Sequence, residues 1–153
     1  MKRFFLITSF MLLSLVTFAR GGNGYQNAVG VRGGWGAEFN YQRYLGVNNR
    51  VEAAIGCNRY GFETAATFQW MFDIPANVNG MFKWYAGAGA GIGSWNSNNH
   101  DKGFSFAAKG QIGIEYTFSF PMMLSFDYRP GLNFCPESRF DWSGFGLGIR
   151  YCF

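Results

Sequence analysis

The chain has 153 residues, enough for one domain, but its composition departs from that of a water-soluble protein. Only 14% of the residues are charged, against about 25% in soluble domains, and 20% are aromatic. The formal net charge of +4 falls to +2 once Lys2 and Arg3 are left out with the N-terminal segment that we expect to be removed. A net charge of +2 is too small to indicate that the protein binds nucleic acid.

The N-terminal segment has the features of a secretory signal peptide. Lys2 and Arg3 form a basic start, and residues 4–18 are apolar apart from small hydroxyl residues. Thr17 and Ala19 are the small residues that a signal peptidase site requires, so we expect cleavage after Ala19. An N-terminal membrane anchor is the alternative, but the stretch is shorter than the roughly 18–20 residues that span a bilayer. We therefore predict a signal peptide over residues 1–19 and a barrel domain over residues 20–153.

Beyond the signal, apolar and polar residues alternate with period two, which predicts β-strands. Turn-rich stretches divide the alternation into eight strands, and the first reversal is placed at Trp35-Gly36. Without that turn, residues 28–45 would form one strand far longer than the roughly 9–11 residues of a tilted membrane strand. Residues 135–142, "CPESRFDW", are predicted to be a loop. The predicted strands are 27–34, 37–45, 50–60, 62–74, 81–95, 104–120, 124–134 and 143–153.

One face of the predicted strands carries equal numbers of positive and negative side chains. A solvated face need not balance its charges, but the interior of a narrow barrel must, because an unpaired charge there is costly. We therefore predict a charge network in the lumen. Its basic members are Arg32, Arg50, Lys83, Lys109, Arg129 and Arg150, and its acidic members are Glu38, Glu52, Glu63, Asp73, Glu115 and Asp127.

The other face is apolar, with aromatic residues at two levels and aliphatic residues between them. Phe82, Trp84 and Tyr116 fall at one level and Phe104 and Phe145 at the other. Two aromatic girdles around an aliphatic band are typical of a barrel in a bilayer. A soluble β-sandwich, with the apolar face as its core, is the alternative.

Glycines at alternate positions of the polar face favour a narrow barrel. They relieve tight curvature and leave room for Tyr44, Tyr85 and the arginines. The glycines concerned are Gly87, Gly89, Gly91, Gly93, Gly144, Gly146 and Gly148.

Over residues 24–153 this pattern resembles the small OmpA/OmpX-type outer-membrane barrels of Gram-negative bacteria. Phe153, with Tyr151 two residues before it, is similar to the C-terminal signature that these proteins present to the outer-membrane assembly machinery. The resemblance implies an all-β fold, an eight-stranded antiparallel up-and-down transmembrane β-barrel located in the cell outer membrane. The implied partners are outer-membrane lipid, lipopolysaccharide, the assembly machinery and periplasmic chaperones, with no particular surface partner indicated.

We expect a non-enzymatic protein with a structural or surface-interaction role and with no catalytic, cofactor or metal site. A narrow channel or small-molecule port is the first alternative, although eight strands leave an interior just filled by side chains. A lipid-modifying enzyme is the second. It would use His100 with Ser97 and Asp101, and with Ser138, Glu137 and Asp141 across the mouth. A solvated loop histidine is the simpler interpretation, because no His-x-Ser pair occurs.

The three cysteines of the predicted mature chain show no metal-ligand spacing. The strand phase places Cys57 on the outward face and Cys152 at the opposite end from Cys135. We therefore expect no internal disulfide.

Overall fold

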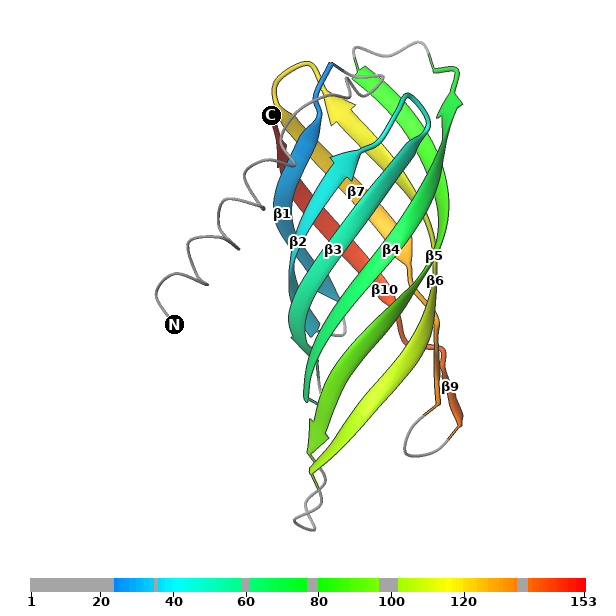
Figure 1. The fold of residues 1–153 in the computed structure, drawn as a ribbon. Helices are drawn as coiled ribbons and strands as arrows, with labels where there is room; N and C mark the ends of the chain where they lie inside the picture. The colour runs from blue at the N-terminus through cyan, green and yellow to red at the C-terminus, as the bar shows by residue number, and fades with distance from the viewer. Residues whose placement is uncertain (1–23, 35, 59–60, 77–79, 97–101, 135–137) are drawn as a thin grey trace, which may run out of the picture.

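The computed structural model describes residues 24–34, 36–58, 61–76, 80–96, 102–134 and 138–153. Every regular element in these residues is a β-strand (Figure 1). None of the described residues forms a helix long and apolar enough to cross a membrane. The strands are β1 (Asn27–Gly34), β2 (Gly36–Tyr44), β3 (Asn49–Asn58), β4 (Gly61–Ile74), β5 (Gly80–Asn96), β6 (Lys102–Phe118), β7 (Met122–Tyr128), β8 (Gly131–Asn133), β9 (Arg139–Asp141) and β10 (Phe145–Cys152).

The strands close into an antiparallel barrel. Consecutive strands pair from β1 to β7, β10 pairs with both β7 and β1, and the β5–β6 pairing completes the circle. Because β8 continues the line of β7 and β9 leads into β10, ten segments make eight strands around the barrel. The predicted all-β, eight-stranded, up-and-down barrel is confirmed, and the alternative architecture of two packed sheets is wrong because the strands form one closed sheet.

The first reversal lies where the sequence predicts it. β1 ends at Gly34 and β2 begins at Gly36, and Gly33 pairs with Ala37. The pairing of β1 with β2 therefore places a tight hairpin where the alternation of apolar and polar residues continues without a break.

The predicted loop over residues 135–142 is wrong at its C-terminal part. Residues 139–141 form β9, which pairs with β8. Between β9 and β10, three residues (142–144) lie opposite only Arg129 and Pro130, which is a β-bulge. Asp141 holds the bend, because its side chain accepts hydrogen bonds from the backbone and hydroxyl groups of Ser143. A bulge bends the strand and shifts the phase of its alternation, so the period-two pattern does not reveal β9.

The two ends of the barrel differ in length and shape. The N-terminal start of β1 and the end of β10 meet at one end, where Asn27 N donates to Phe153 O at 2.9 Å; we call it the terminal end. At the opposite, distal end, the β5–β6 and β8–β9 hairpins reach beyond the β1–β2 hairpin (Figure 1). β5 and β6 contain 17 residues each, whereas β1 contains 8.

Burial alternates along the strands in the opposite sense to that of a soluble protein. In β10, Leu147 is 58% exposed on the outside, while Arg150 is 1% exposed inside. The pattern holds across the barrel: the largest fully buried side chains include arginines and glutamates, and the exposed ones are mostly aromatic or aliphatic. The core of this barrel is therefore its polar lumen.

Candidate functional site: the charged lumen

All twelve charged residues predicted for the lumen lie in ion pairs. Each of the eight strands around the barrel contributes at least one of them, so the pairs cross the interior in several directions. The pairs are Arg32–Glu38, Arg32–Asp127, Arg50–Glu115, Lys83–Asp73, Lys109–Glu63, Arg129–Glu38, Arg129–Glu52 and Arg150–Glu52.

Glu52 is the acidic centre of the network. Its carboxylate accepts from the guanidinium of Arg129, from Arg150 Nη2 at 3.2 Å and from the amide of Gln42. Arg150 contacts no second carboxylate among the described residues; its Nε donates to Asn40 at 3.0 Å and its Nη1 to Ser125 at 2.5 Å. Because every one of these groups is buried, each charge depends on its partners rather than on water.

Arg50 and Glu115 form a second buried pair nearer the terminal end. Their atoms approach to 2.6 Å, and both side chains are fully buried. The guanidinium also lies 4.6 Å from the ring centre of Tyr85 and donates to Tyr44 Oη at 3.2 Å. Stacking on an aromatic face and a charge partner offset part of the cost of removing this cation from water, while Arg50 Nη2 has no hydrogen-bond partner among the described residues.

A third cluster occupies the distal part of the lumen. Arg32 bonds to Asp127 at 2.6 Å and to the backbone oxygen of Gly144 at 2.6 Å. Glu38 bridges Arg32, at 3.4 Å, and Arg129, at 2.9 Å. Arg129 thus links this cluster to Glu52, and the network is continuous from the centre of the barrel to its distal end.

The Lys83–Asp73 pair joins the neighbouring strands β5 and β4, whereas the Lys109–Glu63 pair joins β6 and β4 across β5. In both pairs the carboxylate is partly exposed to solvent. Lys83 contacts Asp73 at 3.1 Å, and the Asp73 side chain is 67% exposed. Lys109 contacts Glu63 at 2.8 Å. Because solvent screens such pairs, we expect them to stabilise the barrel less than the buried arginine pairs.

Inward glycines leave the space that the large polar side chains fill. A methyl group added at Gly113 would lie 2.6 Å from Asp127 Cβ and 2.7 Å from Tyr85 Cζ. One added at Gly146 would lie 2.5 Å from Arg32 Cζ. The absence of a side chain at these positions therefore lets the charge network fit inside a narrow barrel.

This crowding predicts a contrast between two glycine-to-alanine variants. Gly113→Ala should lower the free energy of unfolding by about 1–3 kcal/mol, because Asp127 and Tyr85 would have to move. Gly33→Ala has nothing within 4 Å of the added methyl group and should change stability little. Urea unfolding of both variants in lipid vesicles measures the difference in stability. Equal stabilities would show that the lumen has room for a methyl group at Gly113.

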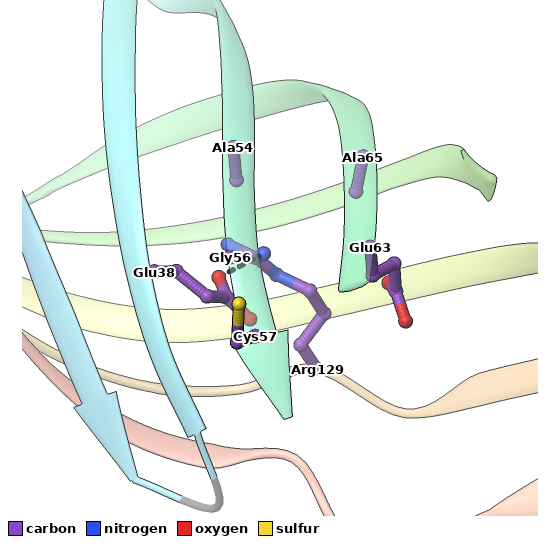
Figure 2. A pocket seen from close by; sticks show the side chains of 7 residues that line it. All are labelled: Glu38, Ala54, Gly56, Cys57, Glu63, Ala65 and Arg129. Atoms are coloured by element: carbon purple, nitrogen blue, oxygen red, sulfur yellow. Dashed lines mark hydrogen bonds and ion pairs between the residues drawn. The ribbon is translucent and has the colours of Figure 1, made fainter. Parts of the chain in front are cut away.

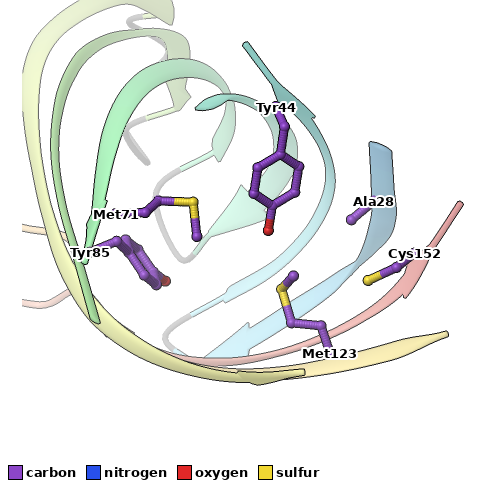
Figure 3. Close-up of a cluster of buried hydrophobic side chains, with 6 residues drawn as sticks. All are labelled: Ala28, Tyr44, Met71, Tyr85, Met123 and Cys152. Carbon is purple, nitrogen blue, oxygen red and sulfur yellow. The ribbon is translucent and has the colours of Figure 1, made fainter. Parts of the chain in front are cut away.

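A small hydrophobic cluster fills the lumen at the terminal end. Met71, Met123 and Cys152 direct their sulfur-bearing side chains into the same space as Tyr44 (Figure 3). Ala28 completes the wall, and Tyr25 packs against the cluster. The polar pattern of the inward face gave no reason to expect apolar residues here, but the strand phase of Met71 and Met123 could have identified them.

A cavity lies in the distal lumen between β2, β3 and β4. It is lined by the side chains drawn in Figure 2, with Arg129 extended across it toward Glu38. Its volume of about 10 Å³ matches about one water molecule. The space left by Ala54, Gly56 and Ala65 is therefore too small for an organic ligand.

Several other predicted residues are placed apart from this network or outside the described residues. His100, Ser97, Asp101, Glu137 and Cys135 lie outside them. Tyr151 and Phe153 are exposed at the terminal end, with ring centres 6.3 Å apart. Cys57 is exposed and Cys152 is buried, and both are free thiols.

The described residues include no group of three His, Cys, Asp or Glu side chains placed to hold a metal ion. The chain matches no protein-family model, no curated protein and no solved structure. Its function must therefore be inferred from the burial, charge pairing and shape of the barrel itself.

Proposed function

We propose that the chain is an integral outer-membrane β-barrel protein with a structural or surface-interaction role and no enzymatic activity. The inverted burial pattern carries this proposal. Arg50, Arg150 and Glu52 are at most 1% exposed, while Val31, Ile112 and Leu147 are more than half exposed. In water that distribution is unfavourable on both faces, because the buried charges lose their hydration and the apolar side chains on the outside are exposed to water. In a bilayer the outer face is solvated by lipid and closure satisfies the backbone.

The aromatic residues support the same environment. Near the terminal end, Phe72 stacks on Trp84 at 4.2 Å and Tyr116 contacts Phe118 at 4.7 Å. Toward the distal end of the apolar band, Tyr128 lies 4.5 Å from Phe145. Aromatic side chains concentrated toward the two ends of a barrel fit the two interfaces of a membrane.

A filled lumen favours a structural or interaction role over a channel. Paired arginines and glutamates occupy the centre, the hydrophobic cluster occupies the terminal end, and the distal cavity holds about one water molecule. With little room between the described residues of the lumen, we expect partners to contact the outer wall and the distal hairpins. Outer-membrane lipid and lipopolysaccharide would contact that wall, and the exposed Tyr151 and Phe153 are available to the assembly machinery.

A gel of outer-membrane fractions tests the proposal. The protein should sediment with the outer membrane and migrate faster before boiling in detergent than after it, because a closed barrel resists unfolding by detergent. A periplasmic protein with no heat-dependent shift would overturn the proposal, because the apolar outer face would then need another cover.

Conductance separates this role from the channel alternative. In a planar bilayer the heat-modifiable protein should show no steady ion current. A reproducible single-channel current would mean that the paired charges in the lumen rearrange, and it would favour the narrow port instead.

A further inference from the structure

The distal hairpins carry an apolar surface that extends beyond the length a membrane strand needs. About 9–11 residues span the bilayer, so the 17-residue strands β5 and β6 exceed it by about six residues. At about 3.3 Å per residue and a tilt near 45°, this adds roughly 14 Å along the barrel axis. We call the large apolar side chains that point outward at this end of β6 and along the β8–β9 hairpin the apron: Phe104, Phe106, Leu132, Phe134, Phe140 and Trp142.

The apron is one continuous patch. Phe106 and Phe134 have ring centres 6.0 Å apart, Leu132 pairs with Phe140 across β8 and β9, and Phe140 contacts Trp142. Trp142 is 73% exposed and Phe104 is 67% exposed, above every other large apolar side chain described on the barrel. The apron thus holds the two most exposed large apolar side chains of the described residues, and its other four members are 38–46% exposed.

We propose that the apron is the contact surface for a second copy of this chain in the membrane. The proposal rests on the outer-membrane function proposed above, which holds all copies in one orientation. Two copies related by a twofold axis along the membrane normal then present their aprons to each other at the same height. Because the strands are tilted, the two facing sheets cross at close to a right angle, which is an established packing geometry for sheets.

The area and the charge of the apron suit this partner. Six side chains that expose roughly 100 Å² each give about 600 Å², near the upper limit for monomers and approaching the 800 Å² that each partner contributes to a stable interface. Ser94 and Ala108, which are exposed beside the apron, are uncharged. These two positions therefore add no like charge where a copy faces its own surface.

Disulfide cross-linking in intact outer membranes tests the inference. The background protein has Cys57, Cys135 and Cys152 replaced by alanine. Ala108→Cys places a thiol within the apron, on β6 opposite Leu132, whereas Ala53→Cys places one on β3, on the other side of the barrel. Mild oxidation should yield at least about tenfold more dimer from the Ala108→Cys protein than from the Ala53→Cys protein.

A second pair of substitutions links the cross-link to the apron. Phe104→Asn with Trp142→Asn, added to the Ala108→Cys protein, should lower the dimer yield about tenfold while the heat-dependent gel shift persists. Equal cross-linking from Ala108→Cys and Ala53→Cys, or no cross-link at Ala108→Cys in a folded barrel, would overturn the dimer but not the barrel. Quenching of Trp142 fluorescence by brominated lipid in a folded, uncross-linked barrel would assign the apron to lipid instead. If the protein without substitutions showed no heat-dependent gel shift, the proposed outer-membrane function itself would be overturned.

Discussion

Glu52→Gln should be among the most destabilising single substitutions in this barrel. Among the described residues, it removes the only carboxylate that Arg150 contacts and one of the two that Arg129 contacts. Removing one partner of a buried ion pair typically costs about 3–5 kcal/mol, because the remaining charge stays buried without compensation. The fraction of protein that retains the heat-dependent gel shift, measured across a urea series in vesicles, should fall at a much lower urea concentration.

Two matched variants distinguish charge loss from other effects of this substitution. Glu63→Gln removes a carboxylate from a pair nearer to solvent and should cost about 1 kcal/mol or less. Adding Arg150→Met to Glu52→Gln removes the uncompensated cation and should restore part of the lost stability. If Glu52→Gln and Glu63→Gln were equally stable, the buried network would contribute nothing beyond surface ion pairs.

Leu147→Arg tests whether the outer face meets lipid. Leu147 lies on β10 in the middle of the apolar band and is 58% exposed. An arginine facing lipid near the bilayer centre costs about 2–4 kcal/mol, whereas one on a water-exposed strand costs little. We expect this loss in the free energy of unfolding in vesicles, together with a smaller yield of heat-modifiable protein.

Val47→Arg is the control for this substitution. Val47 lies in the β2–β3 turn at the terminal end and is 61% exposed, close to the exposure of Leu147. Because the depth-dependent penalty falls to about 0–1 kcal/mol near the interfaces, Val47→Arg should be nearly neutral. Two equally mild effects would mean that water, and not lipid, covers the band around Leu147.

Val47→Arg is a better control than a charged substitution on the inward face, and the buried position of Gln111 shows why. Gln111 accepts hydrogen bonds from Thr67 at 3.1 Å and from Gln69 at 2.8 Å, and it is 4% exposed. A charge introduced there would disrupt a tightly filled lumen, so it would be costly for a different reason. The lipid-facing effect is therefore isolated only by comparison with a site of equal exposure outside the band.

The sequence by itself determined the strands, the face on which each side chain lies and the balance of charge inside. These features are local or additive. Alternation with period two sets the face of each residue along a strand, and a count of residues on one face shows whether charges cancel. The same counting predicted eight strands, which is the number the barrel has. It failed at β9, because the extra residue of a bulge changes the phase of the alternation.

Only the tertiary structure decided which charge meets which, and where the lumen is apolar. Arg32 and Asp127 are 95 residues apart in the chain, yet they lie 2.6 Å apart because closure of the barrel sets the stagger of distant strands. The same stagger brings Met71 and Met123 together at the terminal end and aligns the aromatic residues of β6, β8 and β9 in the apron. Pairing across a barrel depends on strand number, stagger and side-chain length together, and no local pattern in the chain records that combination.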